Sequence, residues 1–181
     1  MKGRMDLLVT MLIAFLLLSL FSPAVHARET FVVSDYSNPE WETYVRDMID
    51  EYNVVLPATA PQLVYERKEV KECLGTERPD GFPKPTGIIL CHNSLASHPA
   101  MLYGLMQAFI FLPTDTRTRP EDFLCHEFMH AVTNIKDKPV GTPLRDNSCV
   151  WGLSPQLGAF DISYINETFA APQQKEKHKK K

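Results

Sequence analysis

The sequence lacks a hydrophobic run long enough to span a bilayer. Its longest largely apolar stretch, Leu7 to Phe21, has 15 residues, whereas a transmembrane helix needs about 20. Lys2 and Arg4 precede this stretch, and small or permissive residues follow it up to Ala27. This pattern predicts a signal peptide at 1–27, cleaved after Ala27, with an uncleaved signal anchor as the alternative. No cysteine follows the stretch directly, so a lipoprotein anchor is not suggested.

The sequence also lacks internal repeats and the length for two good cores. With 181 residues, 44% of them hydrophobic, the chain can bury one core. Residues 172–181 contain five lysines and no large apolar side chain, so we predict a basic, disordered tail there. One domain remains at 28–171, with 12 Lys and Arg against 20 Asp and Glu, a net charge of −8. Such an acidic domain argues against nucleic acid as the main partner.

One short motif carries recognisable chemistry. Residues 123–131 contain the pattern His126-Glu127-x-x-His130. In a helix, the two histidines lie one turn apart on a single face, and Glu127 is rotated by about 100°. Two neutral imidazoles on one face can bind a zinc ion, while the glutamate can act as general base toward water. The alternative is a core helix that happens to carry two histidines.

The hydrophobic periodicity predicts an α+β fold. Thr118, Pro120 and Glu121 form a capping box that marks the start of the motif helix. Residues 101–107 are compatible with either helix or strand, and His92 and His98 are expected at the surface. A small mixed sheet with an N-terminal, an active-site and a C-terminal helix is therefore expected. The expected order is strand 30–33, helix 38–53, strands 62–67, 87–91 and 108–113, helix 119–134, an irregular loop and helix 160–169.

All four cysteines follow residue 27, which fits an oxidising compartment. They allow three disulfide connectivities. We favour Cys73 with Cys91 across a loop, and Cys125 with Cys149, which ties the motif helix to the segment after it. The competing interpretation makes Cys125 or Cys149 a zinc ligand. Because Cys125 is adjacent to His126, their side chains diverge by about 100° on a helix, which argues against this interpretation for Cys125.

The motif and its surroundings resemble the metzincin-like zinc metallopeptidases, in particular small catalytic domains of the matrixin and snapalysin type. A strand, Phe109 to Leu112, leads into the motif helix, and Asp146 to Val150 occupies the place of the family's methionine turn. Leu153-Ser154-Pro155 together with Asp161-Ile162 is similar to the family's C-terminal helix signature. The resemblance implies a zincin-like fold, a bound Zn²⁺ and peptide hydrolysis, with strand 109–112 at the edge of the cleft.

The sequence departs from the family pattern after the second histidine. The family's glycine and third-ligand positions hold Thr133 and Lys136 here, and Val150 stands in place of the methionine. Asn134 tolerates the left-handed conformation that glycine supplies at a helix end, and Asp137 follows it at the family's interval. We therefore predict that His126, His130 and Asp137 bind zinc. Asp161, Asp146, Glu167 or no protein group at all remain the alternatives for the third ligand.

These observations predict a secreted or periplasmic zinc endopeptidase that acts on a peptide or protein substrate, with Glu127 as general base. We expect a monomer without stable membrane insertion after signal cleavage. The alternative is a catalytically silent binding module on a metallopeptidase scaffold, which Lys136 and the missing glycine motivate. A third interpretation is a disulfide-linked surface protein that makes contact through its basic tail.

Overall fold

The structure, a computed structural model, describes residues 28–73, 81–93, 99–113, 120–139, 143, 145, 147–152 and 154–170. The predicted signal peptide 1–27, the predicted tail 172–181, the capping residue Thr118 and Asp146 lie outside this part of the chain. Within it, no helix combines the length and the hydrophobicity of a membrane-spanning segment.

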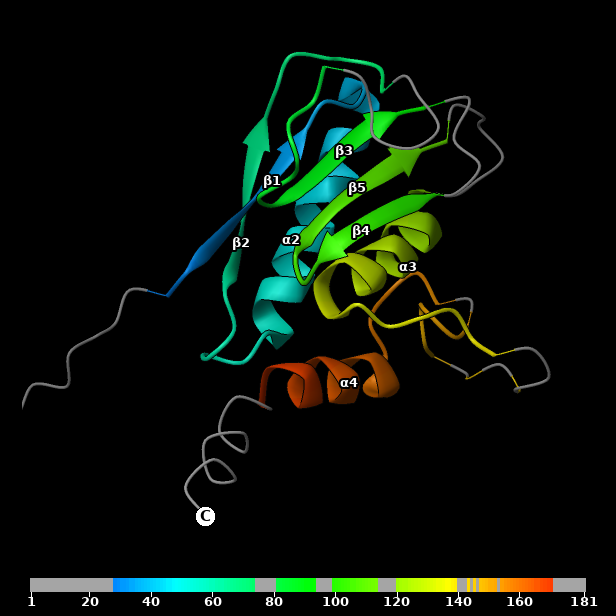
Figure 1. Ribbon diagram of the computed structural model, residues 1–181. Helices are drawn as coiled ribbons and strands as arrows, with labels where there is room; N and C mark the ends of the chain where they lie inside the picture. The colour runs from blue at the N-terminus through cyan, green and yellow to red at the C-terminus, as the bar shows by residue number, and fades with distance from the viewer. Residues whose placement is uncertain are drawn as a thin grey trace, which may run out of the picture.

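Five strands form one mixed sheet with the order β2-β1-β3-β5-β4 (Figure 1). Four strands run parallel to their neighbours, and β4 runs antiparallel to β5 at one edge. The expected α+β class is confirmed. The additional strand is β4, which falls in the segment whose pattern is compatible with either helix or strand. The bounds are β1 Thr30–Asp35, β2 Gln62–Arg67, β3 Ile88–His92, β4 Ala100–Gly104 and β5 Gln107–Leu112.

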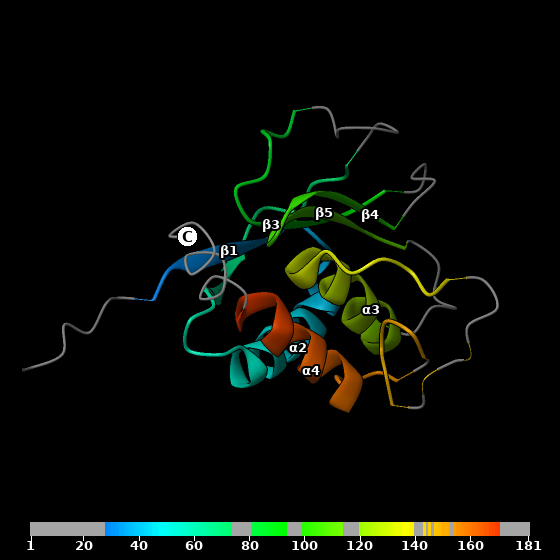
Figure 2. The ribbon, with the colours of Figure 1, turned by 60° about the horizontal axis from the view of Figure 1, so that its bottom comes forward.

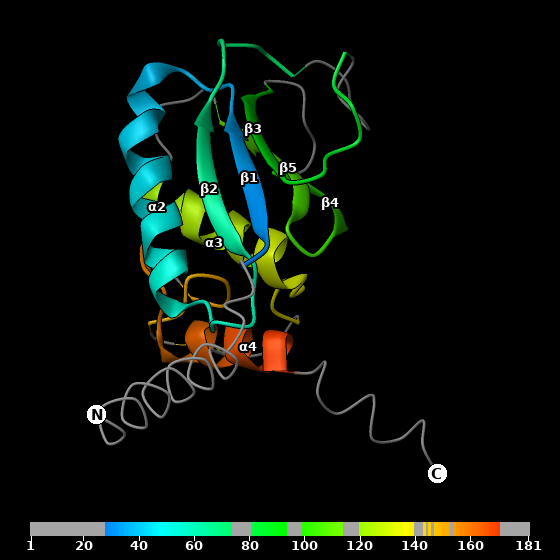
Figure 3. The ribbon, with the colours of Figure 1, turned by 90° about the vertical axis from the view of Figure 1, so that its left-hand side faces the viewer.

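The helices cover one face of this sheet (Figure 2). A 3-10 turn at Pro39–Trp41 leads into α2 (Glu42–Val55), which lies alongside β1 and β2 in Figure 3. The buried positions of α2, Val45, Met48, Ile49 and Tyr52, recur at helical spacing and join the main core. The helix α3 (Pro120–Thr133) packs against α2 and the strands β4 and β5, and α4 (Ala159–Ala170) packs against α3.

The opposite face of the sheet is covered by irregular chain. Phe82 packs there against Phe109, with ring centroids 5.8 Å apart, in a second apolar cluster. The Cys73–Cys91 disulfide joins this covering segment to β3. The second disulfide joins Cys125 of α3 to Cys149, so both predicted pairings are confirmed. Two disulfides fit a protein of an oxidising, extracytoplasmic compartment.

Two expectations about the sheet are wrong. The strand 109–112 does not lie at the cleft edge, because β5 is paired on both sides and β4 takes the edge position. His92 is not a surface residue: it is the last residue of the fully buried strand β3, and the 3-10 turn covers it. Its Nε2 accepts a hydrogen bond of 3.2 Å from the backbone N–H of Asn38. His98 lies outside the described residues.

Candidate metal centre

The helix α3 presents its two histidines on one face. Its apolar positions, among them Leu124, Phe128 and Met129, are completely buried against the sheet and α2. This packing fixes the rotation of the helix, so that His126 and His130 face an open cleft. Their ring centroids lie 4.7 Å apart, and their Nε2 atoms are separated by 3.0 Å. The expected helix, 119–134, agrees with the observed one to within a residue at each end.

A left-handed residue ends α3 and turns the chain back toward the histidines. Asn134 has a φ of 57°, and its backbone N–H donates to the carbonyl of His130 at 2.9 Å. The predicted left-handed conformation of Asn134 is thus confirmed. Three residues later, an Oδ1 of Asp137 lies 3.4 Å from Nε2 of His126 and 3.2 Å from Nε2 of His130. The structure therefore brings the three predicted ligands together.

The hydrogen bonds of the imidazoles define which nitrogens face the cleft. The Nδ1 of His126 lies 3.1 Å from the carbonyl oxygen of Cys149, and that of His130 lies 2.6 Å from the carbonyl oxygen of Ile135. Because a carbonyl only accepts, each Nδ1 carries a proton, and in the neutral form of each ring the Nε2 presents a lone pair. Two lone pairs and a carboxylate oxygen thus converge. A cation between them would relieve their mutual repulsion.

The spacing of these three atoms fits zinc. Zinc binds nitrogen and carboxylate oxygen at about 2.0–2.2 Å in a tetrahedral arrangement, which places neighbouring ligand atoms roughly 3.3–3.5 Å apart. The observed separations are 3.0, 3.2 and 3.4 Å. Burial lowers the pKa of His126, and a positive charge on His130 lowers it further. A lowered pKa favours the neutral imidazole that binds metal. Asp137 is 81% exposed, so the site opens to solvent.

Glu127 is buried beside these groups without a hydrogen-bond partner for one of its oxygens. Only 3% of the residue is exposed, and its Oε2 contacts no donor among the described residues. Its Oε1 lies 4.0 Å from Nε2 of His126. Burial, with a smaller contribution from the charge of Asp137, raises the pKa of Glu127 to about 8. Such an unsatisfied buried carboxyl group is more typical of a functional site than of a structural one.

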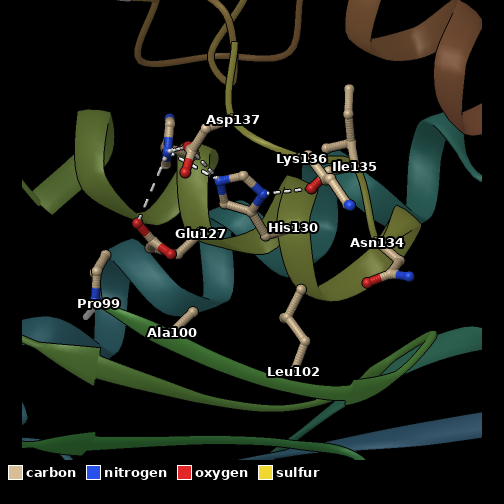
Figure 4. Close-up of a pocket in the computed structure, with 10 residues that line it drawn as sticks. Pro99, Ala100, Leu102, Glu127, His130, Asn134, Ile135, Lys136 and Asp137 are labelled. Atoms are coloured by element: carbon tan, nitrogen blue, oxygen red, sulfur yellow. Dashed lines mark hydrogen bonds and ion pairs between the residues drawn. The ribbon is translucent and has the colours of Figure 1, made fainter. Parts of the chain in front are cut away.

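The cleft has a volume of about 440 Å³ and lies between α3 and the edge strand β4. Glu127, His130 and Asp137 turn toward one another above β4 in Figure 4. Ala100 and Leu102 of β4 line the cleft, whereas Met101 and Tyr103 pack on the other face of the sheet. The cleft therefore has the two histidines, Glu127 and Asp137 on one wall and an apolar strand edge on the other.

The other acidic candidates lie elsewhere. Asp161 is fully buried, and its carboxylate accepts hydrogen bonds from Ser148 Oγ and from the backbone N–H groups of Cys149 and Gly158. Glu167 is exposed on α4 and accepts a hydrogen bond from Ser163. Neither belongs to the cluster of His126, His130 and Asp137, and Asp146 lies outside the described residues.

Several parts of the site have no signature in the sequence. The carbonyl groups of Cys149 and Ile135 orient the two histidines, and main-chain atoms leave no trace in residue type. Two signals in the sequence place residues near 149 beside the motif helix: the predicted Cys125–Cys149 disulfide, and the resemblance of Asp146 to Val150 to the methionine turn. Lys136, in the family's third-ligand position, is exposed, and its carbonyl accepts a hydrogen bond from the indole N–H of Trp151.

No family model and no curated protein sequence matches this chain. The interpretation of the site therefore depends on its own geometry.

Proposed function

We propose that this protein is an exported zinc-dependent endopeptidase. One observation carries the proposal: the Nε2 atoms of His126 and His130 and a carboxylate oxygen of Asp137 converge within 3.4 Å of one another at an open cleft. Lys136 also lines the cleft, but the described cluster of potential ligand atoms consists of His126, His130 and Asp137. These three groups form the donor set of a catalytic zinc site, which uses three protein ligands and leaves a position for water or substrate.

The remaining chemistry is assigned to Glu127. When bound, zinc supplies Lewis acidity toward a peptide carbonyl and toward water. Glu127 accepts a proton from a water molecule in the cleft and then donates it to the amine of the departing peptide. Its burial suits this exchange, because a carboxyl group with a raised pKa holds and releases a proton near neutral pH. The positive charge of a divalent cation nearby favours the ionised form that the first step needs.

An extended peptide is the substrate that the cleft fits best. The edge strand β4 pairs with β5 on one side, and among the described strands it has no partner on the other. Its free backbone groups can therefore bind a peptide by strand addition. The side chains of Ala100 and Leu102 then offer apolar contacts within the cleft. This assigns to β4 the role that the resemblance implies for strand 109–112.

We further propose that the protein acts as a monomer in the periplasm or outside the cell. The two disulfides, Cys73–Cys91 and Cys125–Cys149, support an extracytoplasmic location. The acidic charge of residues 28–171 supports a peptide rather than a nucleic acid as substrate.

The test combines metal analysis with hydrolysis of an unstructured protein substrate. We expect one zinc ion per chain, loss of activity with a chelator, and recovery when zinc is restored. Glu127→Gln should retain zinc but lower kcat/KM about 10²- to 10⁴-fold, the usual contribution of a general acid–base group. A purified chain that binds no zinc, or a Glu127→Gln variant as active as wild type, would favour a silent binding module instead.

A further inference from the structure

The turn at residues 147–152 contacts one of the three candidate ligands directly and the residue that precedes another. Through the carbonyl of Cys149 it accepts a hydrogen bond from Nδ1 of His126, at 3.1 Å. Through the indole Nε1 of Trp151 it donates a hydrogen bond of 3.0 Å to the carbonyl of Lys136, which immediately precedes Asp137. The same short turn therefore contacts both sides of the proposed metal centre.

The turn has no regular secondary structure, so its position depends on its attachments. Its one covalent attachment to α3 is the Cys125–Cys149 disulfide, whose Cα atoms lie 5.7 Å apart. On the other side, Asp161 of α4 accepts hydrogen bonds from Ser148 and Cys149. The Trp151 ring lies on Phe160 of α4, with centroids 4.9 Å apart. Cys125 and Cys149 are both buried, at 0% and 2% exposure.

Asp137 needs an external support to act as a ligand. It follows α3 in an irregular segment and is 81% exposed, so burial does not hold its side chain in place. On one side, Ile135 is held by the hydrogen bond that Nδ1 of His130 donates to its carbonyl. On the other side, the indole of Trp151 holds the carbonyl of Lys136. These two hydrogen bonds orient the main chain so that the next carboxylate faces the histidines.

We propose that the 147–152 turn is a redox-dependent clamp on the metal centre, closed by the Cys125–Cys149 disulfide, with Trp151 as the positioning residue for Asp137. The proposal rests on the metal site proposed above. A dithiol reductant would open the clamp: the protein S–S bond breaks and takes up two electrons and two protons, while the dithiol becomes a disulfide. His126 and Asp137 would then lose their fixed orientation, and zinc affinity would fall.

The coupling must act in both directions. If closure of the disulfide strengthens zinc binding, bound zinc makes the disulfide harder to reduce. The reason is that zinc binding and disulfide reduction belong to one thermodynamic cycle. A tenfold difference in zinc affinity corresponds to a shift of about 30 mV in the reduction potential of a two-electron couple. The Cys73–Cys91 disulfide lies on the opposite face of the sheet and should not respond to zinc.

The first experiment measures zinc affinity by competition with a chromophoric chelator. We compare wild type, Cys125→Ala/Cys149→Ala and the matched control Cys73→Ala/Cys91→Ala; alanine is used because free thiols themselves bind zinc. Loss of outer-shell support typically weakens metal binding about 10- to 100-fold, and we expect this loss for the first pair and less than about twofold for the control. Equal affinities for wild type and the first pair would overturn the proposal. A wild-type chain that binds no zinc would instead overturn the proposed function.

The second experiment isolates Trp151 and does not depend on how well the cysteine variants fold. Trp151→Phe keeps an aromatic ring beside Phe160 but removes the indole N–H that donates a hydrogen bond to the carbonyl of Lys136. We expect about tenfold weaker zinc binding, and no further loss when the substitution is added to Asp137→Ala, because Trp151 acts through Asp137. Equal losses in both backgrounds would show that Trp151 merely stabilises the fold and would overturn its assignment as a positioning residue.

The third experiment tests the reverse direction of the coupling in the wild-type protein. Each disulfide is titrated with a dithiol at defined potential, with and without zinc, and the free thiols are located by alkylation and peptide mapping. We expect zinc to protect Cys125–Cys149 alone. Unchanged or easier reduction of this disulfide in the presence of zinc would contradict the clamp.

Discussion

Asp161 and Glu127 are both buried carboxyl groups within the same domain, and their surroundings differ. Asp161 accepts hydrogen bonds from three donors, one hydroxyl and two backbone N–H groups. Glu127 has one oxygen with no donor among the described residues, and it lies beside two imidazole lone pairs and another carboxylate. The first carboxylate completes a hydrogen-bond network, whereas the second has an oxygen to which no described residue donates a hydrogen bond.

This difference separates a structural polar network from a candidate functional one. A buried carboxylate with all its hydrogen bonds made contributes to stability and organises the chain around it. A buried group left unsatisfied lowers stability, and its persistence points to a ligand that is bound at that place. The comparison therefore predicts that loss of Asp161 lowers the stability of the fold, whereas loss of the Asp137 carboxylate at the candidate metal centre lowers metal binding and leaves stability almost unchanged.

The largest effects are expected for the two aspartates. Asp161→Ala should lower the free energy of unfolding by about 3–5 kcal/mol, because Ser148, Cys149 and Gly158 lose a charged acceptor within the protein. Asp137→Ala should leave the stability of the zinc-free protein within about 0.5 kcal/mol of wild type, since Asp137 is exposed. Its zinc affinity should nevertheless fall more than about 100-fold, beyond what loss of an outer-shell group causes. Urea unfolding and chelator competition measure the two quantities.

Glu167→Ala is the control for these variants. Glu167 is on the same helix as Asp161 but is exposed, so both stability and zinc affinity should remain close to wild type. If Asp137→Ala behaved like Glu167→Ala in zinc binding, Asp137 would not be the third ligand.

A smaller effect is expected from the protonation of Glu127. Its pKa rises from 4.5 in the unfolded chain to about 8 in the zinc-free folded protein. Between these values the folded state holds one proton more than the unfolded state, so the free energy of unfolding falls as the pH rises through this window. The loss amounts to a few kcal/mol, since a tenfold change in proton affinity corresponds to about 1.4 kcal/mol.

The Glu127→Gln variant isolates this contribution. The lowered pKa of His126 has the opposite effect on stability, because the free energy of unfolding falls as the pH drops below 6.5. This contribution is the same in wild type and in Glu127→Gln. The difference between the two stability curves, measured by urea unfolding without zinc, should therefore grow in favour of the variant from about pH 5 to pH 8. Parallel curves would show that Glu127 is not buried in an unsatisfied state, and the comparison with Asp161 would fail.

The sequence is most informative where side chains alternate clearly between the core and solvent. The bounds of β2 follow directly from its alternation of apolar and polar residues. The apolar residues that recur at helical spacing in α2 predict its buried face. The strand β4 could not be predicted because its residues are half-buried or exposed throughout, so they provide no periodic contrast. The resemblance implies that strand 109–112 lies at the edge of the cleft, so the wall that β4 forms is missed.

In the candidate site, too, some groups could be predicted from the sequence and others could not. His126, Glu127 and His130 follow from a fixed spacing on a helix. Asp137 follows from the resemblance, because Asn134 tolerates the left-handed backbone of the family's glycine and Asp137 lies at the family's interval after it. Their role as a zinc centre stays a prediction. The main-chain carbonyls that orient the histidines could not be predicted, because every residue carries a carbonyl and only the tertiary structure determines which one lies within reach.

The smallest expected effect concerns Asn134, the residue that returns the chain toward the histidines. At a φ of 57°, alanine costs about 1 kcal/mol, whereas glycine adopts this conformation without strain. Asn134→Ala should therefore be about 1 kcal/mol less stable than Asn134→Gly in urea unfolding. It should also bind zinc more weakly, because relief of the strain moves Asp137 away from His126 and His130. The hydrogen bonds that Asp161 accepts do not involve residue 134 and should be unaffected. If both variants bound zinc equally well, the left-handed turn would not be what places the third ligand, and the convergence of the three acceptors would need another cause.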